Sequence, residues 1–564
     1  MTSDHFSATE LARMCATKGV RHVVISPGSR NAPLIIAFNA QEGITCLRVI
    51  DERSAAFFAL GMAQQLHEPV ALVCTSGSAV LNYAPAVAEA FYQRVPLLLI
   101  TADRPEEWID QGEGQAIRQE GVLHGHVKKT IQLPRMATDE LSRWHARRLI
   151  NEAIDATLLP VPGPVHVNVP FAEPLYGRAP VASGDEVRPV VAQVLTESFI
   201  LPEHARWLIG QVSTCRRVMV LAGQGVWSAG LRKQLKRLAA LPQVTVLTEA
   251  TSNLDDNAFI TSIDRVIEGV NETNRKDLAP DLLITFGGAI VSRRIKALLR
   301  KWRPAQHWNV DVGQRHVDTY QSLTHDVAVS PEIFFAQLAE AVRPTEGSFY
   351  GEAWRMVDQR TSQRHYAVLA KAPYCDLTVF QTLMERIPAG TDVQLANSTA
   401  VRYAQLFERP HGHRWFSNRG TSGIDGCTST AVGAAFASQR LTTLITGDTA
   451  FCYDSNAFWN DHLSPQLKVV VIDNGGGNIF RYIDGPDRDP ELLPWFEAPH
   501  GRDIGKLVHS YGLPYLHAHD HASLKAGLEA LYGTYDRPAV LHITTDAHTS
   551  PKVLRDYFTQ LRAV

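Results

Sequence analysis

Short apolar runs alternate with longer amphipathic stretches along most of the chain. The apolar runs lie at residues 22–25, 45–50, 70–75, 97–101, 165–169, 217–221, 245–247, 282–286, 307–310, 393–396, 444–446, 469–473 and 540–543. Runs of this length suit strands buried on both faces, and the stretches between them are long enough for helices. Strands separated by helices form β-α-β units, so the pattern predicts an α/β protein built from doubly wound parallel sheets.

Two breaks divide this pattern into three blocks. Residues 174–189 are rich in Pro and Gly, and a less sharp break lies at residues 361–374, near the end of a long helical stretch. We therefore expect three domains, at residues 1–180, 190–360 and 375–564. The outer blocks share length and strand spacing, which suggests related folds. The middle block is expected to be mainly structural.

The N-terminal residues predict a helix. Ser7 and Glu10 have the S-x-x-E spacing of a capping box, and Leu11 and Met14 follow at helical spacing. No apolar stretch typical of a signal peptide lies here, so we expect none.

Composition excludes several kinds of partner. The chain has 55 Lys and Arg against 58 Asp and Glu, a net charge of −3, which argues against a nucleic-acid partner. The longest apolar runs are far shorter than the ~20 residues of a membrane-spanning helix, so we expect no membrane span. The seven cysteines are scattered without a C-x-x-C pair. This favours a reducing cytoplasm over a disulfide framework or zinc ribbon.

Polar residues directly follow two apolar runs of the third block. Asp448 comes shortly after the run that ends at residue 446, and Asn474 lies 26 residues further on, after the next run. One strand–helix–strand crossover fits that spacing, so both side chains would emerge at the carboxyl ends of neighbouring parallel strands. Carboxylate, amide and carbonyl oxygens suit Mg²⁺, and the glycines at 475–477 would let the backbone approach a phosphate. A Gly-Asp pair alone is common in turns, but this combination predicts a site for a metal ion and a diphosphate.

These two segments resemble the signature of thiamin diphosphate-dependent enzymes, a Gly-Asp pair followed one crossover later by Asn-Asn. Asp473 departs from the signature at the first Asn, and Thr449 replaces a common Gly. The resemblance implies thiamin diphosphate and Mg²⁺ as cofactors, with Mn²⁺ as an alternative metal. It also implies that Asp448, Asn474 and the backbone of Gly476 hold the metal.

The other half of such a site lies in the first block. Asp51 and Glu52 follow an apolar run, and by themselves they would be read as a helix cap and a residue that complements the helix dipole. In the resemblance, Glu52 matches the glutamate that binds N1′ of the aminopyrimidine ring. That contact favours the imino tautomer, whose imine removes the C2 proton. Thr75, in a Thr-Ser-Gly triplet, matches the pyrimidine-binding loop.

Six longer segments narrow the resemblance. They are SPGSR at 26–30, TADRP at 101–105, GQAIRQ at 114–119, PFAEPLYG at 170–177, NSTAVR at 397–402 and SNRGTSGIDG at 417–426. They resemble the 2-succinyl-5-enolpyruvyl-6-hydroxy-3-cyclohexene-1-carboxylate synthases, thiamin-dependent enzymes of menaquinone biosynthesis. The resemblance implies decarboxylation of 2-oxoglutarate and 1,4-addition of the succinyl carbanion to isochorismate. Both substrates are dianions, which a closed pocket must meet with cations.

The resemblance assigns roles to single residues. The catalytic residues would be Glu52, Arg402 and Arg419. Substrate contacts would come from Ser29, Arg30, Arg104 and Gln115 on the isochorismate side, from Arg402 and Arg419 on the 2-oxoglutarate side, and from Arg118, Arg293, Ile479 and Phe480. Further cofactor contacts would come from Ser398, Ile424, Gly447 and Thr449. Arg293 stands where the family has Lys, and Gly114 where relatives often have Asn, so isochorismate binding is the detail most open to change.

Three other functions stay open from the sequence. One is another thiamin-dependent carboligase of the acetolactate synthase type, which would use pyruvate and often FAD. The second is an NAD(P)-binding oxidoreductase, because residues 221–225 imitate a dinucleotide-binding turn and Glu249 follows the next run. Ser228 replaces the third glycine of that fingerprint, however. The third is a non-catalytic relative, against which Glu52 and Asp448 argue.

The expected assembly follows from the resemblance. In enzymes of this kind the pyrimidine half and the diphosphate half of a site come from different subunits. We therefore expect a homodimer or a dimer of dimers.

Overall fold

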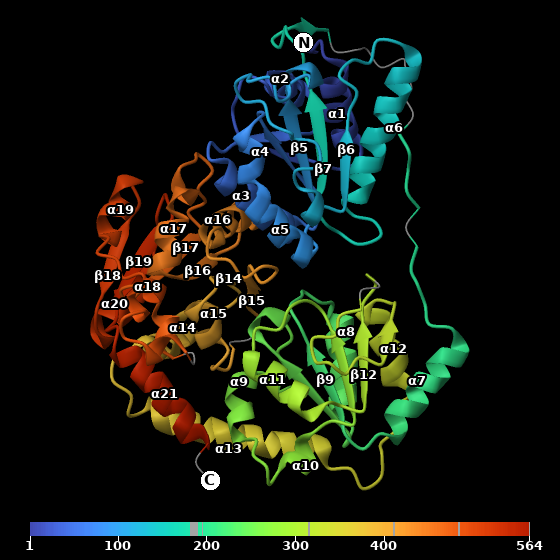
Figure 1. Ribbon diagram of the computed structural model, residues 1–564. Helices are drawn as coiled ribbons and strands as arrows, with labels where there is room; N and C mark the ends of the chain where they lie inside the picture. The colour runs from blue at the N-terminus through green and yellow to red at the C-terminus, as the bar shows by residue number, and fades with distance from the viewer. Residues whose placement is uncertain (181–189, 195, 314–315, 410–411, 483–484, 563–564) are drawn as a thin grey trace.

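The computed structural model describes residues 1–180, 190–194, 196–313, 316–409, 412–482 and 485–562; of the expected break at 174–189, residues 181–189 lie outside them. Figure 1 shows three lobes, each built around one sheet with helices packed against it. Every strand pair in these three sheets is parallel. The predicted fold class is thus confirmed. We call each sheet with its helices the N-terminal, middle or C-terminal domain.

The N-terminal domain has a six-stranded sheet of order β3-β2-β4-β5-β7-β6. Its strands are β2 His22–Ile25, β3 Thr45–Arg48, β4 Val70–Cys74, β5 Leu97–Asp103, β6 Lys129–Gln132 and β7 Val165–Pro170, and its helices are α1 Phe6–Thr17, α2 Ala32–Ala40, α3 Glu52–Leu66, α4 Ser78–Asn82, α5 Ala84–Gln93 and α6 Glu140–Ala156. Neighbouring residues such as Val23 and Val24 belong to two different core clusters, so both faces of the sheet are packed. A short antiparallel pair, β1 Thr2–Ser3 and β8 Arg178–Ala179, closes the domain.

The middle domain has a five-stranded sheet of order β10-β9-β11-β12-β13. Its strands are β9 Val218–Ala222, β10 Val244–Thr248, β11 Leu282–Phe286, β12 Gln306–Val310 and β13 His325–Val327, and its helices are α7 Pro202–Thr214, α8 Ala229–Ala239, α9 Ile263–Val266, α10 Arg275–Leu278, α11 Arg293–Trp302 and α12 Pro331–Ala341. The long helix α13, Tyr350–Leu369, runs through the expected boundary at residue 360. It contacts α9 of this domain and α21, Thr549–Arg562, of the C-terminal domain.

The C-terminal domain has a six-stranded sheet of order β15-β14-β16-β17-β19-β18. Its strands are β14 Asp392–Leu395, β15 Arg414–Ser417, β16 Thr442–Gly447, β17 Leu467–Asp473, β18 Tyr515–Ala518 and β19 Ala539–Thr544, and its helices are α14 Asp376–Arg386, α15 Thr399–Ala404, α16 Cys427–Ser438, α17 Asp448–Tyr453, α18 Leu493–Glu497, α19 Ile504–Ser510, α20 His521–Leu531 and α21 Thr549–Arg562. Counted within each domain, the strand order is 2-1-3-4-6-5 in both outer domains. The outer domains therefore share one topology.

Helices α3 and α16 join the two outer domains. A Cβ atom on Gly61 would lie 2.0 Å from the carbonyl oxygen of Thr430, and one on Gly433 would lie 2.0 Å from the carbonyl oxygen of Phe58. Only glycine allows two helix backbones to approach this closely. Since α3 begins at Glu52, this contact sets one predicted site residue against the C-terminal domain.

The structure tests two expectations, the helix start at Ser7 and the absence of a membrane span. Helix α1 begins at Phe6 with His5 as its N-cap and no side-chain cap, so the predicted Ser7 capping box is wrong. The Glu10 carboxylate instead accepts a hydrogen bond from Arg13, which competes for the group that the capping box needs. Among the described residues, no helix has the length and apolar character needed to cross a membrane.

Candidate active site

The carboxyl ends of β16 and β17 bring the predicted metal ligands together. Gly447 pairs with Ile472 in the sheet, so Asp448 at the start of α17 lies beside the end of β17. Asn474 follows directly after that strand. The backbone N–H groups of Thr449 and Gly476 both lie close enough to the Asp448 carboxyl group to lower its pKa. Gly476 therefore belongs to the same cluster. The two segments therefore meet at the carboxyl ends of neighbouring strands, as the spacing predicted.

One oxygen of the Asp448 carboxyl group is buried without a hydrogen bond among the described residues. Its Oδ1 accepts a hydrogen bond from the backbone N–H of Thr449 at 2.6 Å. Its buried Oδ2 makes no hydrogen bond to the described residues and lies 3.3 Å from Nε2 of His500. Burial, together with the nearby Asp473 carboxyl group, raises the pKa of Asp448 to about 8. A bound cation would remove both penalties.

The other two oxygen donors are held in place by their surroundings. The Asn474 amide donates from Nδ2 to Oδ2 of Asp376 at 2.9 Å, which leaves its oxygen for a ligand. Gly476 has a φ of +141°, and a Cβ atom there would lie 2.6 Å from the carbonyl oxygen of Glu497. Its position therefore requires glycine. One carboxylate, one amide and one backbone carbonyl form a hard-oxygen set that fits a magnesium-type ion.

Among the described residues, no group of three His, Cys, Asp or Glu side chains could hold a metal ion. A metal site of that kind therefore has no support. The predicted ligand set is of a different kind, because two of its three donors are an amide and a main-chain carbonyl. Asp376 had no sequence signal as a partner of Asn474, since it lies 98 residues earlier.

Glu52 lies in the first turn of α3. The Asp51 side chain caps this helix by accepting hydrogen bonds from the backbone N–H groups of Arg53 and Ser54, at 2.9 and 3.2 Å. Glu52 is half-buried, and burial, with a smaller contribution from Asp51, raises the pKa of its carboxyl group. A carboxyl group that holds its proton more tightly is suited to a hydrogen bond with a ring nitrogen.

The predicted pyrimidine-binding loop lies beside the first substrate motif. The Oγ1 atom of Thr75 is buried and has no hydrogen-bond partner among the described residues. A Cβ atom on Gly28 would lie 2.3 Å from Cβ of Thr75, so the 26–30 segment packs directly on this loop. On the other side, a Cβ atom on Gly77 would lie 3.1 Å from Cα of Gln115. The loop therefore packs between the two segments, at 26–30 and 114–119, that are predicted to contact substrate.

The cations predicted to bind isochorismate lie at the carboxyl ends of the N-terminal strands. Arg30 is 5% exposed and donates to the carbonyl oxygen of Phe171 at 2.9 Å. Burial, and then the nearby Arg104, lowers the pKa of Arg30. Arg104 lines a cleft of about 660 Å³ together with Arg118. The Arg118 side chain is 82% exposed and pairs with Asp110 at 2.7 Å, so it lies at the outer rim. Ser29, which directly precedes Arg30, is exposed.

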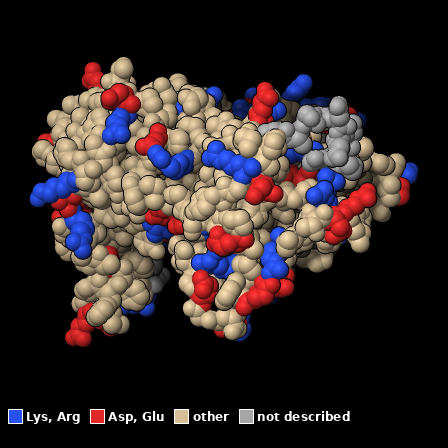
Figure 2. Space-filling view, turned by 90° about the horizontal axis from the view of Figure 1, so that it is seen from above, with Lys and Arg blue, Asp and Glu red and all other residues tan. Residues whose placement is uncertain are grey.

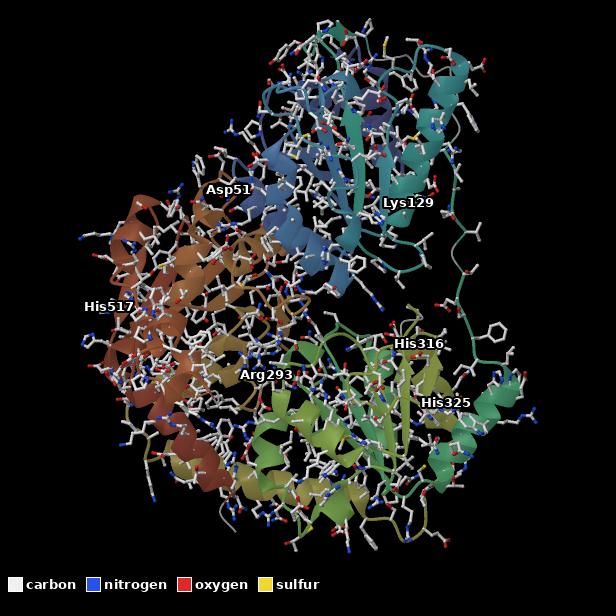
Figure 3. All side chains as sticks on the ribbon, viewed as in Figure 1. Asp51, Lys129, Arg293, His316, His325 and His517 are labelled. Carbon is white, nitrogen blue, oxygen red and sulfur yellow. The ribbon has the colours of Figure 1, made fainter. Side chains whose placement is uncertain are left out.

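A second group of cations lies where the middle and C-terminal domains meet. Burial, followed by Arg402, lowers the pKa of Arg419, and Arg293 contributes to lowering the pKa of both. Arg293 is exposed at the start of α11, between these two domains (Figure 3). Lys296, one turn further along α11, is half-buried and lines a cavity of about 680 Å³ with Arg419. The sequence interpretation missed Lys296, although its i+3 spacing from Arg293 places it on the same helix face.

The remaining predicted contacts lie in loops at the ends of the C-terminal strands. Ser398, with a φ of +69°, caps α15, and its carbonyl oxygen accepts a hydrogen bond from Arg402. Ile424, Ile479 and Phe480 are half-buried, so each keeps part of its apolar surface open. On the face seen in Figure 2, basic and acidic side chains are interspersed rather than gathered by sign.

Comparison with known proteins identifies the family. Residues 7–122 match the family model for the N-terminal TPP binding domain of thiamine pyrophosphate enzymes, and residues 397–543 match the C-terminal TPP binding domain. The chain is 41% identical over 559 residues to 2-succinyl-5-enolpyruvyl-6-hydroxy-3-cyclohexene-1-carboxylate synthase of Flavobacterium johnsoniae, which covers 98% of each chain. It is 40% identical to the enzyme of that name from Porphyromonas gingivalis, over 99% of this chain and 98% of the other. The chain belongs to this synthase family.

Family membership confirms the resemblance drawn from the sequence motifs. The chain is a thiamin diphosphate-dependent enzyme, which rules out the oxidoreductase and non-catalytic alternatives. Glu52 and Thr75 lie within the first matched domain, and Asp448 and Asn474 within the second. The roles of these individual residues stay predictions.

Proposed function

We propose that this synthase-family member decarboxylates 2-oxoglutarate and adds the resulting succinyl group to isochorismate. The product is 2-succinyl-5-enolpyruvyl-6-hydroxy-3-cyclohexene-1-carboxylate, an intermediate of menaquinone biosynthesis. The observation that carries the proposal is the presence of two cation groups, one at the carboxyl ends of the N-terminal strands and one where the middle and C-terminal domains meet. Arg30 and Arg104 form one, and Arg293, Arg402 and Arg419 form the other. Two dianionic substrates need two such groups, because burying an unpaired carboxylate is costly.

The donor geometry supports the cofactor and metal assignments implied by the resemblance. We propose that Asp448, Asn474 and the carbonyl group of Gly476 hold Mg²⁺, or Mn²⁺, and that Ser398, Gly447 and Thr449 contact the diphosphate. The unpartnered Oδ2 of Asp448 supports the metal, and the glycine-only conformation of Gly476 supports a close backbone approach. Bound thiamin diphosphate supplies the nucleophilic carbon and electron sink that decarboxylation of a 2-oxoacid requires.

The chain's own residues prepare the reaction. Glu52 is proposed to hold a proton on its carboxyl group against the pyrimidine ring, and its raised pKa supports this. Thr75 offers an unpartnered hydroxyl beside that position. Ile424 is proposed to support the bent cofactor, while Arg402 and Arg419 bind the carboxylates of 2-oxoglutarate. Ile479 and Phe480 would exclude water from the reacting carbon.

The proposed assembly is a homodimer or a dimer of dimers. Several large apolar side chains close to Glu52 are exposed in the single chain. They are Ile50, Leu81, Tyr453 and Trp459, at 40 to 53% exposure. Arg53 lies over the Tyr453 ring, which connects this surface to the start of α3 (Figure 3, near Asp51). A partner that covers these side chains would also complete the site. The seven free cysteines suit the reducing cytoplasm that we propose as its location.

The direct test is an incubation with 2-oxoglutarate, isochorismate, thiamin diphosphate and Mg²⁺, followed by mass spectrometry of the products. We expect the adduct and CO₂ only when all four are present, and none after any single omission. Pyruvate in place of 2-oxoglutarate serves as the control. Formation of acetolactate from pyruvate, with no product from 2-oxoglutarate, would favour the acetolactate-synthase-type alternative and overturn the proposal.

A further inference from the structure

The loop that carries Arg419 is held by side chains from all three domains. The carbonyl oxygen of Ser417 accepts hydrogen bonds from Gln93 of the N-terminal domain and Gln224 of the middle domain, at 3.2 and 2.8 Å. Within the C-terminal domain, Nη1 of Arg419 donates to Oδ1 of Asn397 at 2.8 Å. A loop anchored in this way moves only if the domains move with it.

The strongest of these anchors is Glu89 on α5, which is 1% exposed. Its Oε1 accepts from the backbone N–H of Gly420 at 2.6 Å, and its Oε2 accepts from both the backbone N–H and the hydroxyl of Thr421 at 2.6 Å. A Cβ atom on Gly420 would lie 2.6 Å from the Glu89 carbonyl oxygen, so glycine is needed for this approach. The Gln93 side chain also donates a hydrogen bond to Oε1 of Glu89, which helps to fix the carboxylate.

We propose that Glu89 is a positioning residue for Arg419. Both N–H groups it binds belong to the two residues that follow Arg419, so the carboxylate fixes the backbone from which that guanidinium extends. Glu89 itself is enclosed by α5 and the loop and does not line the cavity that Arg419 enters. It acts through Arg419, and the inference rests on the proposed binding of 2-oxoglutarate by that arginine.

The test is the Glu89→Gln variant of the full chain with bound cofactor. Glutamine keeps the shape but presents an NH₂ group to one of the loop's N–H donors, so one charge-assisted bond is lost. We expect the KM for 2-oxoglutarate to rise about tenfold, the size of one such bond, while kcat changes little. The KM for isochorismate and the affinity for thiamin diphosphate, read from tryptophan fluorescence, should stay as in the unaltered protein.

A matched control is Glu10→Gln, which neutralises another fully buried carboxylate of the same domain, paired with Arg13 and far along the chain from the loop. It should leave the KM for 2-oxoglutarate unchanged. Because Glu89→Gln removes a buried group, a second variant, Thr421→Val, deletes only the hydroxyl bond at an exposed side chain. It should raise the same KM about threefold.

The Arg419→Ala background separates this inference from the proposed function. If Arg419→Ala leaves the KM for 2-oxoglutarate unchanged, the assigned role of Arg419 fails, and the role of Glu89 fails with it. If Arg419→Ala raises that KM but Glu89→Gln and Thr421→Val do not, only the inference about Glu89 is overturned. If Glu89 acts through Arg419, adding Glu89→Gln to Arg419→Ala should have no further effect on that KM.

Discussion

Glu52 lies at a helix start, where a carboxyl group is usually favoured as a negative charge. The helix start would stabilise a negative charge, yet burial outweighs this effect and raises the pKa of Glu52. We expect Glu52→Gln to keep thiamin diphosphate affinity but to lose at least about a hundredfold in turnover, because an amide cannot shift the proton. Calorimetric cofactor titration and product formation measure the two quantities. Glu42→Gln, on an exposed turn, is the control. Turnover near that of the unaltered chain would exclude the assigned role.

Asp376 supplies a second prediction at the residue scale. It is 2% exposed and accepts from both Nδ2 of Asn474 and the hydroxyl of Thr545. In Asp376→Asn the new amide would no longer select the orientation that leaves the Asn474 oxygen free, so Mg²⁺ affinity should fall about tenfold. The Mg²⁺ dependence of thiamin diphosphate binding, followed by fluorescence, reports this.

Asp392→Asn is the matched control for Asp376. Asp392 is an equally buried carboxylate of the same domain, but it pairs with Arg414 at the opposite end of the sheet. An equal loss of Mg²⁺ affinity in both variants would point to general destabilisation instead.

Single residues also show where sequence interpretation stops. Asp448 and Asn474 were located because each directly follows a strand and needs only its local motif to be recognised. Asp376 and Glu89 contact the site from 98 and 331 residues away in the chain, and neither stands in a motif. Their importance arises from packing between elements, which no local pattern encodes.

At the scale of elements, α13 and α21 are joined by a buried histidine. His365 is 1% exposed, and its Nδ1 lies 2.7 Å from the Tyr557 hydroxyl. Burial, with a smaller effect of Arg265, lowers the pKa of His365 from 6.5 to about 3. The unfolded chain therefore binds a proton below pH 6.5 that the folded chain refuses. The stability that this group contributes is fully present above pH 6.5. It is lost as the pH falls toward 3, by about 1.4 kcal/mol per pH unit.

The corresponding variant is His365→Gln, which can still bond the Tyr557 hydroxyl but has no proton to take up. Urea unfolding between pH 7 and pH 5 should show a shallower fall in the free energy of unfolding than in the unaltered chain. His204→Gln, on the exposed part of α7, should leave the slope as it was. Equal slopes for His365→Gln and the unaltered chain would contradict the assignment.

Elements were predicted better than their ends. Alternation of apolar runs and helix-length stretches located the strands with continuous apolar runs, because both faces of each sheet are covered. It missed β6, β13, β15 and β18, which all lie at sheet edges. The predicted capping box at Ser7 was wrong because the Glu10 carboxylate pairs with Arg13 instead. That pairing is visible only in the folded chain. The glycine turn at 221–225 also has a structural cause. A Cβ atom on Gly223 would lie 2.1 Å from the carbonyl oxygen of Gly288, so the glycine permits two loops to touch.

At the scale of the whole molecule, the two outer sheets share the strand order 2-1-3-4-6-5. The N-terminal and C-terminal domains therefore present equivalent surfaces to their neighbours. Within one chain these domains already pack through α3 and α16. The exposed apolar side chains around Ile50 and Trp459 leave a further surface for a second copy. Sequence patterning could foresee the two sheets but not this arrangement, because contacts between domains depend on surface shape rather than on local periodicity.

Subunit complementation tests whether one site draws on two chains. Glu52→Gln and Asp448→Ala should each be nearly inactive alone. In a mixed dimer, one of the two sites would pair an intact Glu52 with an intact Asp448, so co-refolded equal amounts should recover about a quarter of the activity. Mixing either variant with itself is the control, and sedimentation velocity confirms that dimers have formed. If the mixture stays inactive although mixed dimers are present, both groups must act within the same chain, and the proposed shared site is wrong.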